Sequence, residues 1–409
     1  MYKQFKNIIH YWKKIDPQRL HKFLFILFFI LILLPCLQQN FSLFRVKRLR
    51  GTFEEVEKPQ LTFVNYKSGE YQRQAENYLS SHFGFREIAL RWYNQYLWSA
   101  FRKTYVNWVK LGKEDWLYYR HNIEEYYQGL SYSYFGSKQA AEDTLRLKAQ
   151  KIRQIQQILE KNGTYFTFCF YPSKEMIVPE YLPENRCFFN KKEFCAYQFL
   201  KSQFDSLDVN YIDFCGYFLA IKDTVSYPLF TQTGTHWSNI SAVRSADSLI
   251  RYFEDKLAIN MRNLILIPPV KSKLYEPDAD LEELLNLVFP IPKPRTIGGK
   301  IGVDNDITAV KPKFINIGDS FFWNIANMIP RDSIFDPCHY WYYNSTIYFD
   351  SLHVGVQELN YAQELVSADI VMLSYNTSQL YELKGDFPTM ALNALVTWDS
   401  ISACSKILP

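Results

Sequence analysis

The sequence predicts an α/β fold: a parallel sheet flanked by helices, preceded by an N-terminal transmembrane helix and a helical lead-in region. From residue 137 onward, amphipathic helical patterns alternate with short apolar runs, which is the order that βαβ units produce. The run at residues 164–171 is nearly all apolar and favours β-structure, as expected of a strand that is buried on both faces. A long uncharged segment near the N-terminus predicts the membrane helix.

The N-terminal segment is first basic and then apolar. Five lysines and an arginine fall within residues 1–22, and residues 23–44 carry no charge. This order predicts an uncleaved anchor over residues 23–44, with the basic tail 1–22 in the cytoplasm and the rest of the chain outside it. A cleaved signal peptide or a lipoprotein cysteine at Cys36 are the alternatives, but neither has the small residues that its processing favours.

Composition limits the classes of function. The chain has 409 residues, is 48% hydrophobic and carries a net charge of only +4, so a sizeable core is expected and nucleic acid is not an expected partner. The seven cysteines include no C-x-x-C pair, and we expect no metal and no cofactor. Cys187 and Cys195 are close enough in sequence to form a disulfide in an oxidising compartment.

The remaining elements follow in order. The lead-in region, residues 51–135, is expected to contain a helix over 70–105, interrupted near 81–86, and strand character over 106–119. The α/β domain, residues 136–409, is expected to begin with a helix over 137–161 that places Leu145, Ile152 and Leu159 on one face. Further segments are predicted as helices at 191–206 and 237–253, as strands at 209–215, 313–317 and 368–374, and as an insertion near 262–312 with a short helix at 278–288.

Two short motifs contain residue types suited to acyl transfer, Thr235-His236-Trp237 and Gly318-Asp319-Ser320-Phe321. Ser320 lies where the strand at 313–317 meets a helix start, and free N–H groups there stabilise the negative charge of an acyl-transfer intermediate. His236 is the candidate base that would activate Ser320. Asp319 more plausibly shapes the turn than serves as the acid of a triad. Taken alone, a Gly-Asp-Ser turn is often only a helix cap, and a histidine beside tryptophan is often only packed.

Three further motifs accompany these two: Phe83-Gly84-Phe85-Arg86, residues 112–118 (GKEDWLY) and Tyr171-Pro172-Ser173-Lys174. Together, in this order, the five resemble the AlgX/AlgJ type of alginate O-acetyltransferases, which are SGNH-hydrolase-like, DHHW-type proteins. The resemblance implies that Ser320 is the nucleophile and His236 its base. It also suggests the motif residues Lys174, Trp237 and Gly318 as substrate-binding candidates, although Lys174 is more readily explained as a loop or salt-bridge residue.

One position departs from the family pattern. The family aspartate two residues before the histidine is Gly234 here, and no Asp or Glu lies between Asp223 and Asp247. Because a missing acid costs about ten-thousandfold in rate, four explanations stay open: a distant carboxylate, a backbone carbonyl, a Ser–His dyad, or no catalysis.

The resemblance also implies a function and a location. It predicts a membrane-anchored O-acyltransferase, most simply an O-acetyltransferase, that modifies an exported cell-envelope polysaccharide through an acyl-serine intermediate. The implied location is the bacterial inner membrane, with the soluble body in the periplasm, and the implied acyl donor is a multi-spanning membrane O-acyltransferase. The alternatives are a carbohydrate esterase and a non-catalytic polysaccharide-binding or assembly protein of an envelope export complex.

Overall fold

The computed structural model describes residues 16–51, 56–128, 135–183, 194–266, 270–272, 276–293, 296–298, 301–349 and 352–405. The chain forms two compact units. The first consists of Met1–Tyr105 with Leu284–Phe289, and the second of Val106–Glu283 with Pro290–Pro409. The lead-in region predicted over residues 51–135 is therefore divided between the two units, since the boundary falls after Tyr105.

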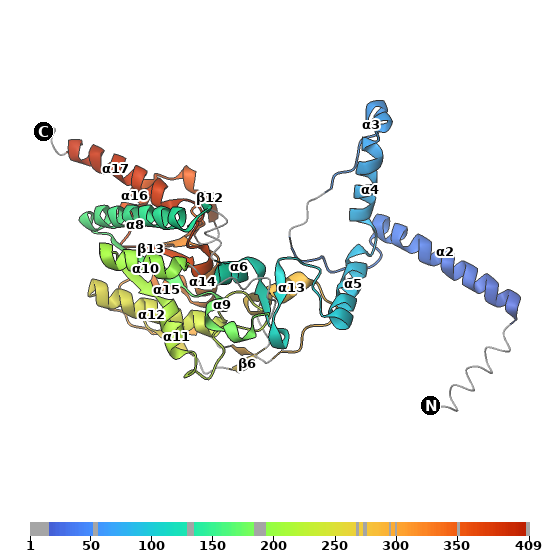
Figure 1. Ribbon diagram of the computed structural model, residues 1–409, viewed down its shortest axis with the longest axis horizontal. Helices are drawn as coiled ribbons and strands as arrows, with labels where there is room; N and C mark the ends of the chain where they lie inside the picture. Colours follow the sequence, from blue (N-terminus) through green and yellow to red (C-terminus); the bar gives the residue numbers. More distant parts are fainter. Residues whose placement is uncertain are drawn as a thin grey trace. The chain divides into compact units, whose positions relative to one another are not determined.

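The first unit is helical. It contains α2 (Pro17–Phe41), α3 (Phe63–Ser68), α4 (Glu70–His82) and α5 (Arg86–Phe101), all visible in Figure 1. Asp16 caps α2 by accepting a hydrogen bond from the Gln18 N–H, and Pro17 occupies the first turn, where its missing N–H has no cost. Within the described part of the chain, α2 is the single helix long and apolar enough to cross a membrane, and its apolar window is not buried. The expected break near residues 81–86 is confirmed between α4 and α5.

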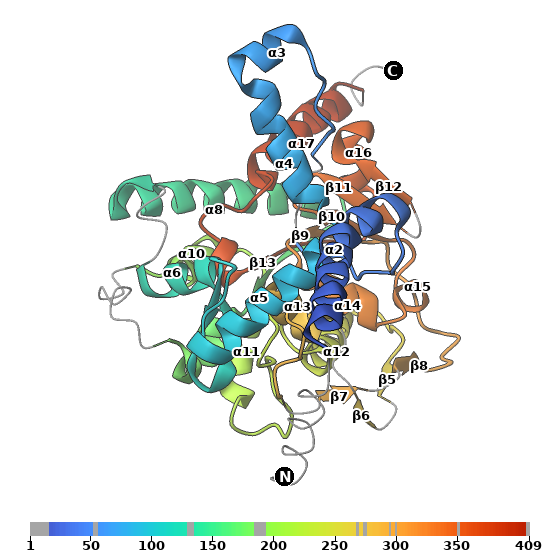
Figure 2. The ribbon, with the colours of Figure 1, turned by 90° about the vertical axis from the view of Figure 1, so that its right-hand side faces the viewer.

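The second unit is built on one seven-stranded sheet with the order β12-β11-β10-β9-β13-β3-β4. Several of its strands, among them β12 and β13, are labelled among the helices in Figures 1 and 2. The five strands from β10 to β4 are parallel, which confirms the predicted parallel sheet, and β11 and β12 extend it antiparallel at one edge. The strands are β3 (Tyr165–Tyr171), β4 (Tyr211–Asp213), β9 (Phe314–Gly318), β10 (Cys338–Tyr342), β11 (Thr346–Phe349), β12 (Leu352–Gly355) and β13 (Ile370–Asn376).

Helices cover both faces of this sheet. One face packs against α8 (Lys138–Lys161), α10 (Ala196–Leu207), α16 (Tyr361–Val366) and α17 (Phe387–Ser405). The other face packs against α11 (Phe214–Ile221), α12 (Asn239–Leu257), α14 (Phe321–Met328) and α15 (Arg331–Ile334). The result is a three-layer α/β/α arrangement.

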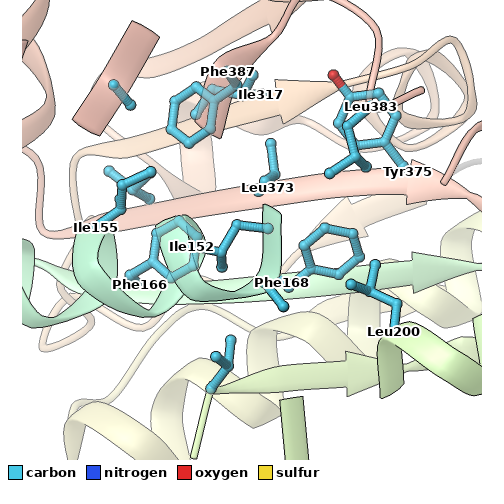
Figure 3. Packing of buried hydrophobic residues seen from close by; sticks show 14 of the residues in the cluster. Ile152, Ile155, Phe166, Phe168, Leu200, Ile317, Leu373, Tyr375, Leu383 and Phe387 are labelled. Atoms are coloured by element: carbon cyan, nitrogen blue, oxygen red, sulfur yellow. The ribbon is translucent and has the colours of Figure 1, made fainter. Parts of the chain in front are cut away.

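The alternation of side chains along each strand divides the core between the two faces. Phe166 and Phe168 of β3 point toward Ile152 and Ile155 of α8 in Figure 3, whereas Cys169 lies in the core on the opposite face. All these side chains are buried. Burial of one such side chain contributes about 1.5–3 kcal/mol. The strand is therefore apolar on both faces, as its sequence predicts.

Shorter elements complete the second unit. A hairpin of β1 (Val109–Leu111) and β2 (Leu117–Tyr119) precedes α6 (Arg120–Gln128), and α9 (Lys174–Ile177) follows β3. The predicted insertion contains β5 (Leu264–Leu266), β6 (Val270–Ser272), the 3-10 helix η4 (Glu276–Ala279), α13 (Asp280–Leu285), β7 (Thr296–Gly298) and β8 (Ile301–Val303). Single 3-10 turns lie at η1 (Lys113–Asp115), η2 (Pro179–Tyr181), η5 (Val356–Glu358) and η6 (Thr377–Gln379).

Polar residues, two of them from the motifs, meet at one edge of the sheet. Ser320 follows β9, Lys174 follows β3, and Asn376 ends β13, so all three lie at the carboxyl ends of parallel strands. This edge is where ligands bind in α/β folds.

Candidate active site

Ser320 lies in a tight turn between β9 and α14, at the N-cap position of the helix. Gly318 makes the turn possible, because an added Cβ would lie 2.3 Å from the backbone oxygen of Ser374 on the neighbouring strand. The Asp319 carboxylate fixes the turn by accepting hydrogen bonds from the N–H groups of Phe321 (3.1 Å) and Asn376 (2.6 Å). Its burial raises the pKa of Asp319 to about 6.

His236 lies directly before α12 and reaches Ser320 with its Nε2 atom. The distance from Nε2 to Ser320 Oγ is 2.9 Å, which confirms the expectation that these two residues meet. The other ring nitrogen, Nδ1, lies 2.8 Å from Oδ2 of Asp280. A carboxylate only accepts hydrogen bonds, so Nδ1 carries the proton, and Nε2 is left to accept one from the Ser320 hydroxyl.

Asp280 is held on both of its oxygens. While Oδ2 accepts from His236, Oδ1 accepts from the N–H groups of Thr235 (2.7 Å) and Leu281 (2.8 Å). The Asp280 carboxylate therefore holds both the backbone beside His236 and the imidazole ring by hydrogen bonds. Of the explanations left open by Gly234, the distant carboxylate is the one that the geometry matches.

The segment that carries Asp280 is hydrogen-bonded at several points to residues 231–239, which include His236 and which we call the histidine loop. The buried carboxylate of Asp278 accepts from the backbone N–H and the side-chain amide of Asn239, both at 3.2 Å. Thr231 Oγ1 donates to the carbonyl of Asp278 at 2.6 Å, and the Glu282 N–H donates to the carbonyl of Thr233 at 3.2 Å. Burial raises the pKa of Asp278 to about 6. These contacts place Asp280 opposite the imidazole.

Lys174 stabilises the histidine loop through hydrogen bonds to its backbone. Its side chain is fully buried, and Nζ donates to the carbonyls of Leu117 (2.7 Å), Gln232 (3.0 Å) and Gly234 (2.8 Å). Burial lowers the pKa of the Lys174 ammonium, and the adjacent carboxylate of Glu175 opposes that effect. Gly234, whose carbonyl accepts from Lys174, lies two residues before His236. Lys174 therefore acts on the conformation of the histidine loop.

Tyr343 lies next to the nucleophile. It follows β10 with a φ of 48°, a left-handed conformation that is strained for a bulky residue, and its N–H donates to the carbonyl of Gly318 at 2.8 Å. Burial raises the pKa of its phenol, as does the charge of Asp319, while a side-chain interaction with Ser320 lowers it. The net shift is upward, so the phenol is protonated at neutral pH and is a hydrogen-bond donor beside Ser320.

Part of the chain that forms this site is similar to a known protein family. Residues 109–265 match the family model of the SGNH hydrolase-like domain of the acetyltransferase AlgX. This segment is therefore similar to an AlgX-type SGNH hydrolase-like domain. The matched segment includes His236 and ends before Asp280 and Ser320. No curated protein matches the chain.

Several solved structures are similar to the chain. The O-acetyltransferase domain of Pseudomonas putida AlgJ has a TM-score of 0.47 at 16% identity, over 71% of this chain and 99% of that one. Pseudomonas aeruginosa AlgX has a TM-score of 0.44 at 14% identity, over 70% of this chain and 66% of AlgX. A DHHW family protein from Eubacterium siraeum has a TM-score of 0.32 at 14% identity, over 60% of this chain and 88% of that protein.

The site residues predicted from the sequence divide into two groups. Ser320 and His236 are brought together, whereas Lys174 and Trp237 are fully buried and Gly318 lies within the sheet edge, so none of these three has a side chain available to a substrate. The expectation that they bind substrate is therefore replaced by positioning roles. Asp319 bonds backbone amides, as a residue that shapes the turn should, and His236 instead pairs with Asp280.

Sequence reasoning missed Asp280, Asp278 and Tyr343. The two aspartates lie more than forty positions after His236, so no local signal pairs them with it, although Asp278-Ala279-Asp280 opens the predicted helix of the insertion. Tyr343 ends a run of aromatic residues, Trp341-Tyr342-Tyr343, which by itself indicates only core packing. The proposed Cys187–Cys195 pair lies outside the described residues, because Cys187 is not among them. Within the described ranges, no group of three or more His, Cys, Asp or Glu side chains is placed to hold a metal ion.

Proposed function

We propose that this protein is a membrane-anchored O-acyltransferase, most simply an O-acetyltransferase, that modifies an exported polysaccharide through an acyl-Ser320 intermediate. The observation that carries the proposal is the continuous hydrogen-bond chain from Asp280 through His236 to Ser320. The match of residues 109–265 to an acetyltransferase family model supports the same reaction class.

In the first half-reaction, Ser320 Oγ attacks the carbonyl carbon of the acyl donor while His236 Nε2 takes the hydroxyl proton. The imidazolium that forms is stabilised by the Asp280 carboxylate at Nδ1. When the tetrahedral intermediate collapses, the bond to the donor's leaving group breaks, and Nε2–H returns its proton to that group. The product is an ester on Ser320.

In the second half-reaction, a hydroxyl of the acceptor sugar attacks the ester carbon. His236 Nε2 takes the acceptor's proton as the new C–O bond forms, and the proton passes to Ser320 Oγ as the acyl–serine bond breaks. Ser320 and neutral His236 are regenerated, so one acyl group has moved and no proton is gained or lost overall.

Each tetrahedral intermediate carries a negative oxygen that needs donors. The N–H of Ser320 at the helix start and the phenol of Tyr343 are the candidates. Removing one such donor from an acyl-transfer site costs about 100–1,000-fold in kcat. A neutral phenol suits this role, because an ionised one would repel the developing charge.

The donor and the location extend the proposal. An anchor at α2 would hold the protein beside a multi-spanning membrane O-acyltransferase that hands over the acyl group, with the second unit in the periplasm of a bacterial inner membrane. The family resemblance supports both, and α2, which is long and apolar enough to span a bilayer, supports the anchor.

The test uses full-length protein in detergent and an activated acetyl ester. Wild type should release the leaving group and gain the mass of one acetyl on Ser320, and it should transfer that acetyl to an oligosaccharide faster than to water. Ser320→Ala should lose both signals while its thermal unfolding stays unchanged. Acetate release without transfer to any sugar would favour a carbohydrate esterase. If wild type is as inert as Ser320→Ala but binds polysaccharide, the protein is a binding or assembly component instead.

A further inference from the structure

The first unit presents an exposed apolar surface on α5. Ile88, Trp92, Tyr93 and Tyr96 have exposed fractions of 40%, 55%, 50% and 59%. They are spaced so that they share one side of the helix, and the other residues on that side, Ala89, Ser99 and Ala100, are small and uncharged. We call this surface the α5 aromatic face.

Other aromatic rings widen the face. Phe289 packs edge-on against Trp92 with ring centroids 5.9 Å apart, and Phe101 packs likewise against Tyr96 at 5.5 Å. Both rings are more than half exposed. The apolar surface is therefore continuous over several side chains, which is unusual for a surface that meets only water.

The opposite side of α5 is occupied by protein contacts. Asn94 Nδ2 donates to the carbonyl of Leu285 at 2.9 Å, and Trp98 is buried. Arg91 donates to the carbonyl of Arg48 at 2.9 Å, which holds the segment after α2 against this helix. The orientation of α5 is thus fixed, and the aromatic side is the one left outward.

The end of the apolar helix α2 is packed against the start of α5. Gly84, in the turn between α4 and α5, lies so close to α2 that an added Cβ would be 2.0 Å from the carbonyl oxygen of Pro35. Phe44, just after α2, packs against Phe85 with centroids 5.9 Å apart. If α2 spans the bilayer, this contact holds the first turn of α5 at the level where the span ends.

The residues around that contact have the chemistry of a membrane interface. Trp and Tyr collect at the level of the lipid headgroups because their rings are apolar and their polar atoms can stay wet. Arg45, Lys47 and Arg48 follow α2 directly and are exposed, which suits anionic headgroups. We propose that the α5 aromatic face lies in the headgroup region of the bilayer, so that the first unit is attached to the lipid surface by α5 as well as by α2.

The experiment places full-length protein in phosphatidylethanolamine–phosphatidylglycerol vesicles that contain brominated lipids, which quench nearby tryptophans. Bromines near the headgroup end of the acyl chain should quench the emission more than bromines near the methyl end. Trp92→Phe should remove most of this difference. Trp98→Phe, on the buried side of the same helix, is the matched control and should leave it in place.

A second variant guards against a simple loss of fold. Adding Tyr96→Trp to Trp92→Phe returns a fluorophore to the face, and it should restore the preference for the shallow bromines. The proposal is overturned if the protein floats with the vesicles while Trp92→Phe leaves quenching unchanged. It is also overturned if the Trp92 emission responds only to added polysaccharide or only to a co-reconstituted membrane acyltransferase, since the face would then bind sugar or protein. None of these outcomes depends on acyl transfer.

Discussion

Replacing Asp280 by asparagine tests whether the acid comes from the insertion. In Asp280→Asn the amide oxygen still accepts from the Thr235 and Leu281 N–H groups, but an NH₂ group replaces the oxygen that faces His236 Nδ1. That NH₂ group forces Nδ1 to accept, so the ring proton moves to Nε2, where it can no longer receive the Ser320 proton.

The expected loss follows from this geometry. A carboxylate about 4 Å from the imidazolium charge stabilises it by about 4 kcal/mol at an effective dielectric of about 20. Losing that attraction corresponds to roughly a thousandfold in rate, and the unfavourable tautomer adds about another tenfold. We therefore expect kcat/KM for acetyl release to fall by about 10³–10⁴.

The assay is hydrolysis of an activated acetyl ester, with thermal unfolding as a check on the fold. The free energy of unfolding should change by no more than about 1–2 kcal/mol, because the backbone bonds to Oδ1 are kept. Asp255→Asn, an exposed aspartate on α12, is the matched control and should leave the rate unchanged. A well-folded Asp280→Asn protein within tenfold of wild type would refute the assignment. Gly234→Asp should bring no gain in turnover, since Nδ1 already has its carboxylate.

Two further predictions concern residues that position the site. Lys174→Met removes the ammonium donor from three carbonyls, and of these Gln232 keeps a second donor, the Leu117 N–H. The other two lose their donor, so we expect the free energy of unfolding to fall by about 2–5 kcal/mol in urea titrations; a loss below about 1 kcal/mol would contradict the bracing role. Asp278 has a pKa of about 6 in the folded protein against a usual 3.8, so the folded state binds the proton more tightly, and ionisation lowers stability as pH rises from about 4 to 6. Asp278→Asn cannot ionise, so its free energy of unfolding relative to wild type should rise by up to about 3 kcal/mol between pH 4 and pH 7. If the difference in the free energy of unfolding between Asp278→Asn and wild type does not change with pH, the ionised Asp278 carboxylate does not destabilise the folded state.

The sequence by itself determined the elements whose cause is local. The apolar strand at β3, the capped helix at α8 and the break between α4 and α5 follow from periodicity, capping and turn residues, and all were predicted close to their observed bounds. Ser320 could be recognised for the same reason, because a strand, a Gly-Asp-Ser turn and a helix start are adjacent in the chain. The antiparallel strands β11 and β12 were not predicted, since their pairing depends on the neighbouring strand β10.

Only the tertiary structure decided which residues meet at the site. Asp280 lies 44 positions after His236, and nothing in local sequence indicates that an insertion folds back to offer its carboxylate to Nδ1. The sequence around Lys174 is that of an exposed loop. In the structure, however, the β1–β2 hairpin and the histidine loop cover Lys174, and three of their carbonyls accept hydrogen bonds from its ammonium. Local propensity acts over a few residues, whereas these contacts form because packing of the sheet and the insertion brings distant polar groups into a buried space where each must find a partner.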